Sequence, residues 1–389
     1  MTAPAASNNL HSKLPDVGTT IFTVMSALAN ECGALNMSQG FPDYDGPEAL
    51  REALGRHAMA GDNQYAPMAG VLALREQIAA KLLRYYGIEA NPDTEITVAP
   101  GATEEIYCAI TACIQPGDEA IVFDPCFDSY EPAITLSGGI ARHIAMSEVD
   151  FSIDWDVVES TINERTRLII INSPHYPSGA ILNDVDLRRL ESLVTQQHNL
   201  YVVSDEVYEH LVFDGERHCS ILQYPGLRER SFAAFSFGKT FHITGWKTGY
   251  CVAPPALTAE LRKVHQFVTF VAVTPVQLAL ADFMAAEPDF PASLAEFYQA
   301  KRDLFCDSLK SSRFGVRPSA GTYFQLLDYS PISDELDTEL AVRYTREQGI
   351  ASIPISVFCE APPAGGYLRF CFAKREEMLL KGAEILCKI

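Results

Sequence analysis

The chain has few basic residues relative to acidic ones, with 30 lysines and arginines against 50 aspartates and glutamates. Its formal charge of -20 at pH 7 disfavours binding to nucleic acids and to anionic membrane surfaces. The chain also lacks a long hydrophobic run, because polar residues interrupt the most apolar stretch, residues 267–281. That stretch is too short and too polar to cross a bilayer. We therefore expect neither a nucleic-acid-binding protein nor a membrane protein.

The ten cysteines include no Cys-x-x-Cys pair and show no spacing typical of metal ligands, so no metal is expected. Residues 1–16 lack the charged and then apolar pattern of a secretory signal. Reduced thiols and a cytoplasmic location are the natural expectation, with several cysteines buried in the core. Internal repeats, low-complexity segments and long linkers are absent as well.

The chain, at 389 residues with 48% apolar residues, can bury a large core and form two domains. Short apolar runs alternate with helical patterns in its middle part, which predicts an α/β fold with a mostly parallel central sheet and helices on both faces. The predicted strands are residues 96–98, 120–123, 167–171, 201–203 and 232–235, and one predicted helix covers residues 184–198.

The pattern changes near residue 288, where a predicted helix (295–311) precedes predicted strands at 321–327 and 367–372. This change indicates a second, smaller α+β domain. The predicted division is an N-terminal arm with part of the small domain (1–45), a large domain (46–287) and a C-terminal small domain (288–389).

Five predicted strands of the large domain end in polar or glycine-containing segments. In an open parallel sheet, ligands bind beyond the carboxyl ends of the strands, so these segments predict a shared site. The segments are residues 100–104, 124–127, 172–177, 204–206 and 236–239.

Lys239 lies in the last of these segments, directly after an apolar strand. Partial burial there would disfavour the ammonium form and leave an amine able to attack a carbonyl. The hydroxyl of Ser236 and the cation of Lys247 would suit a phosphate group. An amine beside a phosphate site predicts a Schiff base with pyridoxal phosphate, whereas an isolated lysine would be a solvated surface charge.

Gly101, Ala102 and Thr103 precede a helical pattern, so free backbone amides and the threonine hydroxyl could hold a phosphate. A plain helix cap is the alternative. Asp205 follows an apolar strand and could keep a pyridine nitrogen protonated. Its alternatives are a helix N-cap or a structural salt bridge.

Three aromatic residues are further candidates for cofactor contacts. Tyr208 could reach the phenolic oxygen of the ring, Phe127 could stack on its face, and Tyr65 could donate to the phosphate. Taken alone, Tyr208 is more typical of a packed tyrosine, Phe127 of a core residue and Tyr65 of a loop aromatic residue. Arg369, in an apolar strand, could bind a substrate carboxylate with two donors, or it could belong to a buried structural ion pair.

Taken together, these segments resemble the class I/II aminotransferases of the pyridoxal-phosphate fold-type I superfamily. Within that family the chain is similar to bacterial methionine aminotransferases and to the kynurenine/glutamine transaminase K group. The resemblance runs from about Lys13 to the C-terminus. It rests on LPDVGTTIFTVMSALA, NMSQGFPDYDGP, NQYAPMAGVLALRE, FDPCFDSYEPAI, VVSDEVYEHLVF, SFGKTFHITGWKTGYCVAP and LRFCFAK.

The resemblance implies that Lys239 bonds to pyridoxal phosphate and moves a proton, with Asp205 at the pyridine nitrogen and Tyr208 at the ring oxygen. Phe127 would stack on the ring. The implied phosphate ligands are Ala102, Thr103, Ser236 and Lys247, the last standing where many relatives carry arginine.

The resemblance also implies a homodimer with shared active sites, to which Tyr65 comes from the partner chain. Arg369 and the backbone of Gly40 would hold the substrate carboxylate. The apolar side chains of Ile21, Phe22 and Phe41 would favour a methionine, aromatic or glutamine-like side chain.

The chain departs from the family at Tyr176-Pro177, where relatives usually have Asn-Pro. That asparagine contacts both the ring oxygen of the cofactor and the substrate carboxylate in the family. Tyr176 is larger and offers one hydroxyl, so the departure leaves cofactor binding in place and bears on substrate preference and rate.

Transamination between a hydrophobic or sulfur-containing L-amino acid, methionine first, and a 2-oxo acid is the leading predicted function. A cysteine-conjugate β-lyase on the same scaffold is the alternative, because both reactions begin by removing the same proton. A non-catalytic regulator that senses pyridoxal phosphate is a distant third, since such proteins carry a DNA-binding module and this chain is strongly acidic.

Overall fold

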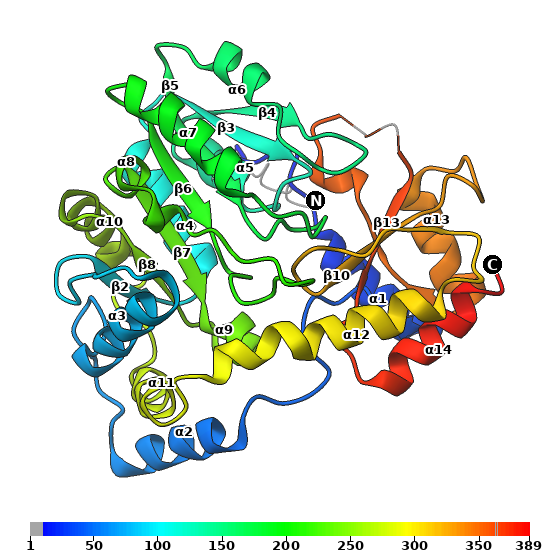
Figure 1. The fold of residues 1–389 in the computed structure, drawn as a ribbon, viewed down its shortest axis with the longest axis horizontal. Helices are drawn as coiled ribbons and strands as arrows, with labels where there is room; N and C mark the ends of the chain where they lie inside the picture. The colour runs from blue at the N-terminus through cyan, green and yellow to red at the C-terminus, as the bar shows by residue number, and fades with distance from the viewer. Residues whose placement is uncertain (1–10, 362, 364) are drawn as a thin grey trace, which may run out of the picture.

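The computed structural model describes residues 11–361, 363 and 365–389. A seven-stranded sheet lies at the centre of the larger part of the molecule (Figure 1). Only β8 runs antiparallel to its neighbours, and every other pair of adjacent strands is parallel. The strands, in spatial order, are β2 (Ile96–Ala99), β8 (Gly249–Val252), β7 (Ser231–Ser236), β6 (Tyr201–Asp205), β5 (Thr166–Asn172), β3 (Glu119–Asp124) and β4 (Ile140–Ala145).

Both faces of this sheet are covered, which explains why its central strands are continuous apolar runs. Successive residues of β5 contribute to two different cores, Leu168 and Ile170 to one and Ile169 and Ile171 to the other. The helices on the first face are α4 (Ala102–Cys113), α5 (Tyr130–Leu136) and α10 (Pro255–Val268). The core on the other face includes side chains of α2 (Glu48–Ala60), α3 (Leu72–Tyr86), α6 (Trp155–Thr161), α7 (Asp184–Gln196), α8 (Pro225–Arg228) and α11 (Thr274–Ala286).

The predicted fold class is confirmed, and all five predicted strands of the large sheet are present. Two strands of this sheet were not predicted. The edge strand β4 is half exposed, so it has no continuous apolar run. The four-residue strand β8 enters the sheet antiparallel, which the alternation of strands and helices does not indicate.

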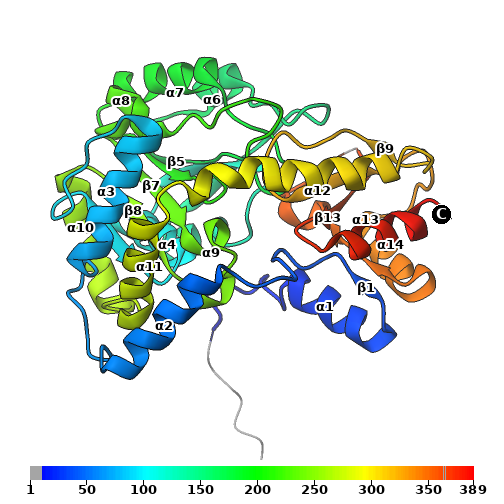
Figure 2. The same cartoon turned by 60° about the horizontal axis from the view of Figure 1, so that its bottom comes forward.

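A smaller antiparallel sheet lies beside the first, with α12 (Leu294–Ser308) reaching across from one part to the other (Figures 1 and 2). Its strands, in order, are β12 (Ile353–Pro354), β13 (Tyr367–Cys371), β10 (Phe324–Asp328) and β9 (Gly315–Val316). The helices packed in this part include α1 (Ile21–Cys32), α13 (Asp337–Arg343) and α14 (Glu376–Leu386).

The N-terminal segment packs with the C-terminal part of the chain. The strand β1 (Leu35–Asn36) pairs in parallel with β11 (Ile350–Ala351), and Met25 and Leu28 of α1 lie in the core of the smaller part. The proposed domain boundaries after residues 45 and 287 agree with this packing and stay a prediction. In the described part of the chain, no helix combines the length and apolar character needed to cross a membrane.

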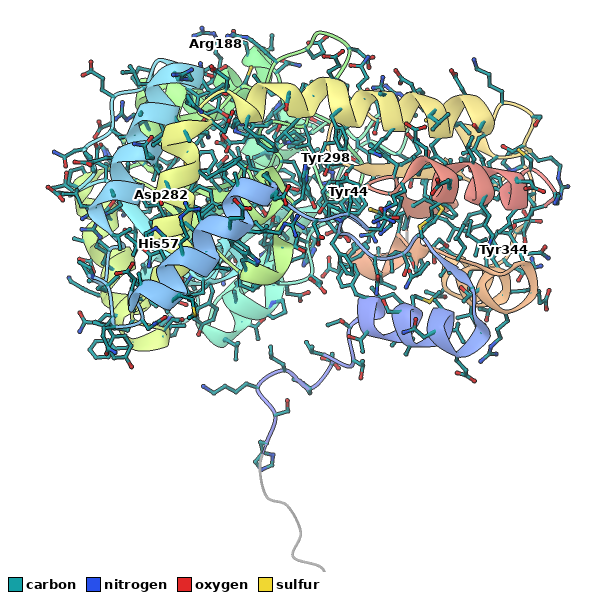
Figure 3. The ribbon with its side chains drawn as sticks, turned by 90° about the horizontal axis from the view of Figure 1, so that it is seen from below. Tyr44, His57, Arg188, Asp282, Tyr298 and Tyr344 are labelled. Carbon is teal, nitrogen blue, oxygen red and sulfur yellow. The ribbon has the colours of Figure 1, made fainter. Side chains whose placement is uncertain are left out.

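His57 connects α2 to α11, which pack against each other. Its Nδ1 lies 2.7 Å from Asp62 Oδ2 and its Nε2 lies 3.0 Å from Asp282 Oδ2 (Figure 3). The hydrogen bond with Asp62, followed by the contact with Asp282, raises the pKa of His57 above its usual value. The protonated imidazole therefore stabilises the folded chain.

We predict that His57→Gln lowers the free energy of unfolding at about pH 6 and has little effect at about pH 9. A raised folded-state pKa contributes its stability below the unfolded value of about 6.5, and this contribution disappears as the pH rises through the folded value. Because both carboxylates are partly exposed, the loss should stay below about 1 kcal/mol. Urea unfolding at the two pH values measures it, and an equal loss at both would contradict the ionic contribution.

Candidate active site

A cavity of about 700 Å³ opens at the carboxyl edge of the large sheet, where the N-terminal segment and the smaller sheet meet it. It brings together all of the candidate residues except Ile21 and Tyr65. The candidates that line it are Phe22, Gly40, Phe41, Gly101, Ala102, Thr103, Phe127, Tyr176, Asp205, Tyr208, Ser236, Lys239, Lys247 and Arg369. The strand ends therefore converge as the sequence predicts.

Lys239 lies in α9 (Phe237–Thr240), the single helical turn that follows β7. Its Nζ donates to the hydroxyl of Tyr323 at 2.9 Å and lies 3.5 Å from the carbonyl oxygen of Gly40. Burial lowers the pKa of Lys239 to about 8, an effect that outweighs the opposing influence of Asp205. About a tenth of the amine is consequently neutral and nucleophilic at pH 7, far more than for a lysine with an ordinary pKa.

Asp205 is buried at the end of β6, where Tyr130 donates its hydroxyl to Oδ2 at 2.7 Å and the Val207 amide donates to Oδ1 at 3.3 Å. Burial raises the pKa of Asp205 to about 6, although these two hydrogen bonds act in the opposite direction. A turn rather than a helix follows Asp205, and no ion pair involves it among the described residues. Both structural alternatives for this carboxylate are therefore wrong.

Gly101 begins the N-terminal turn of α4 with φ at +88°, a conformation that favours glycine. A Cβ at this position would lie 3.6 Å from Lys247 Nζ, so the amide end of the helix and the ammonium face each other closely. No side chain caps α4, and Thr103 is exposed. The amides, the hydroxyl and the cation together offer what a phosphate group requires.

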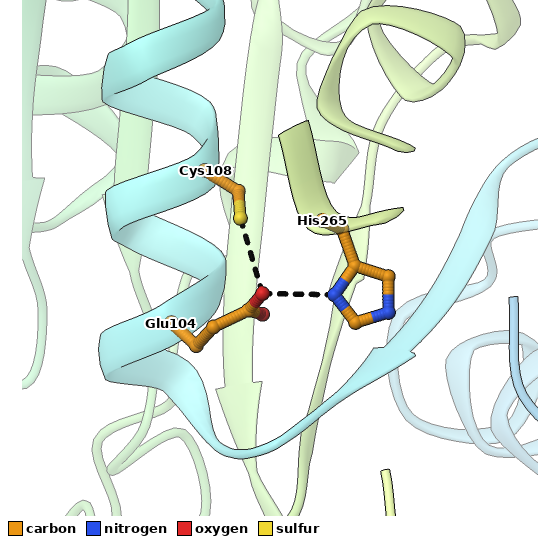
Figure 4. A group of neighbouring side chains, drawn as sticks. All are labelled: Glu104, Cys108 and His265. Carbon is orange, nitrogen blue, oxygen red and sulfur yellow. Dashed lines mark hydrogen bonds and ion pairs between the residues drawn. The ribbon is translucent and has the colours of Figure 1, made fainter. Parts of the chain in front are cut away.

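The first turns of α4 are tied to α10 by a buried group of side chains (Figure 4). Glu104 Oε1 lies 2.8 Å from His265 Nδ1 and accepts the thiol proton of Cys108 at 3.2 Å. The other ring nitrogen of His265 lies 3.2 Å from the Met68 carbonyl oxygen. These contacts fix the helix whose amide end faces the cavity.

Arg369 projects from β13 and is completely buried. Its Nη1 donates to the Tyr176 hydroxyl at 2.5 Å, and its Nη2 donates to the Ser38 carbonyl. Its Nε has no hydrogen-bond partner, and among the described residues no carboxylate forms an ion pair with it. The alternative of a buried structural ion pair is therefore wrong, and the site has capacity for an anionic ligand.

Aromatic rings replace a carboxylate as the neighbours of this guanidinium. Its Cζ lies 4.2 Å from the ring centroid of Phe324, 5.4 Å from that of Tyr176 and 5.6 Å from that of Phe22. Such contacts stabilise a cation yet leave its remaining donors free. Gly40 approaches this group closely, since a Cβ there would lie 3.0 Å from Phe324.

Tyr176 is buried with its ring edge-on to Phe127 at 5.8 Å and to Phe324 at 5.2 Å. Asn172 holds the loop before it, because its Oδ1 accepts the Tyr176 amide at 2.6 Å and its Nδ2 donates to the Asp205 carbonyl at 2.8 Å. The hydroxyl of Tyr176 is therefore committed to Arg369.

Sequence patterns missed Tyr130 and Tyr323, which contact Asp205 and Lys239 directly. Tyr130 falls in one of the segments that carry the family resemblance, three residues after Phe127, so a signal existed. Tyr323 immediately precedes β10, within the predicted 321–327 strand, but no sequence pattern indicates which residue of that stretch reaches the lysine.

Two candidate residues lie outside the lining of the cavity. Tyr65 is 84% exposed and packs only at its edge against Phe270, with ring centroids 5.6 Å apart. Ile21 is half-buried at the start of α1, next to Phe22. The roles of Tyr65 and Ile21 stay predictions.

Comparison with known proteins identifies full-length relatives. Residues 33–386 match the model of the family described as aminotransferase class I and II. The chain is 52% identical over 375 residues to the methionine aminotransferase of Escherichia coli K12, covering 96% of this chain and 97% of that protein. It is 33% identical to a kynurenine–oxoglutarate transaminase of Dictyostelium discoideum, covering 96% and 94% of the two chains.

Solved structures agree with these relatives. A structure of the Escherichia coli methionine aminotransferase superposes with a TM-score of 0.95 at 51% identity, covering 98% of this chain and 99% of that one. The N-succinyldiaminopimelate aminotransferase of Mycobacterium tuberculosis gives a TM-score of 0.93 at 37% identity, with coverage of 97% and 99%.

We predict that the cavity binds a simple carboxylate through Arg369. Hexanoate should bind to the parent protein, and Arg369→Met should weaken that binding by about 2–5 kcal/mol because the buried donors are lost. Isothermal titration calorimetry measures the affinity. The matched control is Arg302→Met, since Arg302 is equally buried but pairs with Asp214 and Asp303 outside the cavity. Equal affinity in the parent and in Arg369→Met would rule out a carboxylate site at this arginine.

Proposed function

Since the chain belongs to the aminotransferase class I and II family, whose members use pyridoxal phosphate, we propose that it exchanges an amino group between an L-amino acid and a 2-oxo acid. One observation carries the proposal. A single cavity holds a half-buried amine (Lys239), a buried carboxylate (Asp205) and a buried guanidinium (Arg369) that has no acidic partner among the described residues. The reaction needs a nucleophile, an electrostatic partner for a ring nitrogen and a carboxylate receptor, and these three groups supply them.

The residues around the cavity fit pyridoxal phosphate. The amides at the start of α4, with Thr103, Ser236 and Lys247, would hold the phosphate, and Phe127 would lie against the ring. Asp205 would face the ring nitrogen and Tyr208 the ring oxygen. When bound, the cofactor supplies an electron sink for negative charge at the substrate α-carbon.

Lys239 would join the cofactor to the chain and then, as a free amine, move a proton at the substrate α-carbon. A pKa of about 8, lowered by burial, suits a base that works near neutral pH. Arg369 would orient the substrate through its carboxylate, and the fixed position of Gly40 beside Phe324 would keep that carboxylate within reach.

Methionine is the proposed first substrate, with aromatic and glutamine-like side chains also accepted. Phe22 and Phe41 line the cavity on the side of the N-terminal segment, and Ile21 precedes them. A thioether packs favourably against such rings. The 52% identity with the Escherichia coli methionine aminotransferase supports this choice.

We propose a homodimer in which Tyr65 reaches the phosphate site of the partner subunit. In support, Tyr65 lies outside its own cavity, and apolar side chains of α2 and α10 are strongly exposed, among them Met59 at 89% and Phe267 at 84%. Exposed apolar groups of this size are typical of a protein interface. A cytoplasmic location is also proposed, in keeping with ten free thiols.

A cysteine-conjugate β-lyase is the alternative on this scaffold, because it needs the same amine and the same carboxylate receptor. Release of pyruvate from a cysteine conjugate in the absence of any 2-oxo acid would favour the lyase. The regulator without catalytic activity is disfavoured, because the strongly acidic charge of the chain opposes binding to DNA.

We predict that Lys239→Ala abolishes turnover of methionine with a 2-oxo acid while the protein still binds pyridoxal phosphate. The phosphate and ring contacts remain, but the covalent attachment and the proton carrier are lost. Turnover assays, together with borohydride reduction and mass spectrometry of the chain, test both parts. Lys263→Ala, a change at an exposed lysine of α10, is the control. Normal turnover in the Lys239 variant would refute the proposed function.

Tyr176 should limit the efficiency of the reaction with methionine, because its hydroxyl already occupies a donor of Arg369. We predict that Tyr176→Asn raises kcat/KM for methionine by an amount equivalent to about 1–3 kcal/mol, since an amide can serve two oxygens. Tyr176→Phe separates the hydroxyl from the ring. Steady-state kinetics over a panel of amino acids gives the answer, and a lower efficiency on every substrate would contradict this view of Tyr176.

A further inference from the structure

Tyr323 has the most direct contact with Lys239 of any side chain that the proposed reaction does not use. It immediately precedes β10 and is completely buried. Its ring packs edge-on against Tyr208, with centroids 5.2 Å apart, and also lies near Tyr298 at 5.7 Å. Its hydroxyl lies 2.7 Å from the Gly40 carbonyl oxygen and 2.9 Å from Lys239 Nζ.

The direction of these two hydrogen bonds follows from the groups involved. A carbonyl oxygen can only accept, so the single hydroxyl proton of Tyr323 goes to Gly40. The phenolic oxygen then has only lone pairs to offer Lys239, and the amine must donate to it. Tyr323 therefore accepts one N–H of the amine at 2.9 Å, and the Gly40 carbonyl oxygen is a second, more distant acceptor at 3.5 Å.

We propose that Tyr323 is a positioning residue that holds the free amine of Lys239 whenever it is not bonded to the cofactor. The inference rests on the proposed role of Lys239 as the group that moves a proton at the substrate α-carbon. A lysine that must leave and return has a long, flexible side chain, and misplacement by about 1 Å is enough to cost on the order of 100-fold in rate. The Tyr323 hydroxyl, as a fixed acceptor for Nζ, removes much of the conformational freedom of the Lys239 side chain.

The same hydroxyl connects the amine to the segment that surrounds the carboxylate receptor. Gly40 accepts from Tyr323, Ser38 accepts from Arg369 Nη2, and the Phe41 carbonyl accepts from Lys374 at 2.8 Å. The neighbour of Tyr323, Phe324, lies against the Arg369 guanidinium. Tyr323 thus sets the position of the amine relative to the groups that orient the substrate.

Tyr323→Phe tests the proposal, because it removes the hydroxyl and keeps the ring. Tyr298→Phe is the matched control, because Tyr298 is also completely buried and its ring contacts that of Tyr323. Tyr298 is labelled in Figure 3. The hydroxyl of Tyr298 lies 3.0 Å from His242 Nδ1 and does not line the cavity. Tyr323→Met serves as a second variant should the phenylalanine form fail to fold.

The first measurement needs no turnover. Trace acetic anhydride labelling of the cofactor-free full chain across a pH series, with mass spectrometry, gives the pKa of the Lys239 amine. Loss of an acceptor destabilises the ammonium form, so Tyr323→Phe should shift this pKa to lower values by roughly 0.5–1 unit. The control variant should leave it at the value of the parent.

The second measurement uses the holoenzyme in a single half-reaction with methionine. Tyr323→Phe should slow the step by about 10- to 100-fold with KM and cofactor affinity nearly unchanged. An unchanged labelling profile and an unchanged half-reaction would overturn the proposal. Equal losses in Tyr298→Phe would also overturn it, because they would trace to packing.

The test of Tyr323 can be distinguished from the test of the proposed function. If Lys239→Ala retained normal turnover, the proposed function would fail. The labelling profile would still report whether Tyr323 holds the amine. If turnover requires Lys239 and the Tyr323 variant behaves like the parent in both measurements, only the inference about Tyr323 is lost.

Discussion

The buried guanidinium of Arg369 is the constraint on which the rest of the site depends. A cation without an acidic partner is costly to bury, and aromatic rings, the Tyr176 hydroxyl and the Ser38 carbonyl offset this cost. Those neighbours come from the N-terminal segment, the loop after β5 and the strand β10. The requirement to surround one charge therefore brings three separate stretches of chain to one edge of the large sheet.

Burial at this edge of the sheet lowers the pKa of Lys239 and raises the pKa of Asp205. Burial disfavours the charged form in both cases, so the Lys239 amine becomes easier to deprotonate and the Asp205 carboxyl becomes harder to ionise. The hydrogen bond from Tyr130 opposes the rise in the pKa of Asp205, and Lys239 donates a hydrogen bond to Tyr323. Opposite shifts in one cavity are typical of sites that move protons, and they agree with the proposed amino transfer.

Tyr176 is the position at which this chain departs from the pattern expected for the family. The family resemblance leads one to expect asparagine there, whereas this chain places an aromatic ring among Phe127, Phe324 and Phe358 and a hydroxyl on the proposed carboxylate receptor. Tyrosine in place of asparagine adds ring contacts and removes the amide donors at this position. Substrate selection is the property that we expect such an exchange to alter most directly, because Tyr176 contacts the proposed carboxylate receptor, Arg369.

Much of the fold and most of the site could be predicted from the sequence. Alternating apolar runs and helical patterns determined the parallel sheet, since strands buried on both faces must be apolar throughout. The sheet then implied that the segments around Gly101, Asp205 and Lys239 share one edge. Composition determined the acidic character, and the motifs determined the family.

Tertiary structure alone decided which side chains contact one another. The alternation of strands and helices does not predict the antiparallel strand β8, and the half-exposed strand β4 has no continuous apolar run. Tyr323 reaches Lys239 across a separation of 84 residues, and Arg369 meets Tyr176 across 193. Contacts between such distant segments depend on how two layers of the fold pack, and no local pattern in the sequence records that packing.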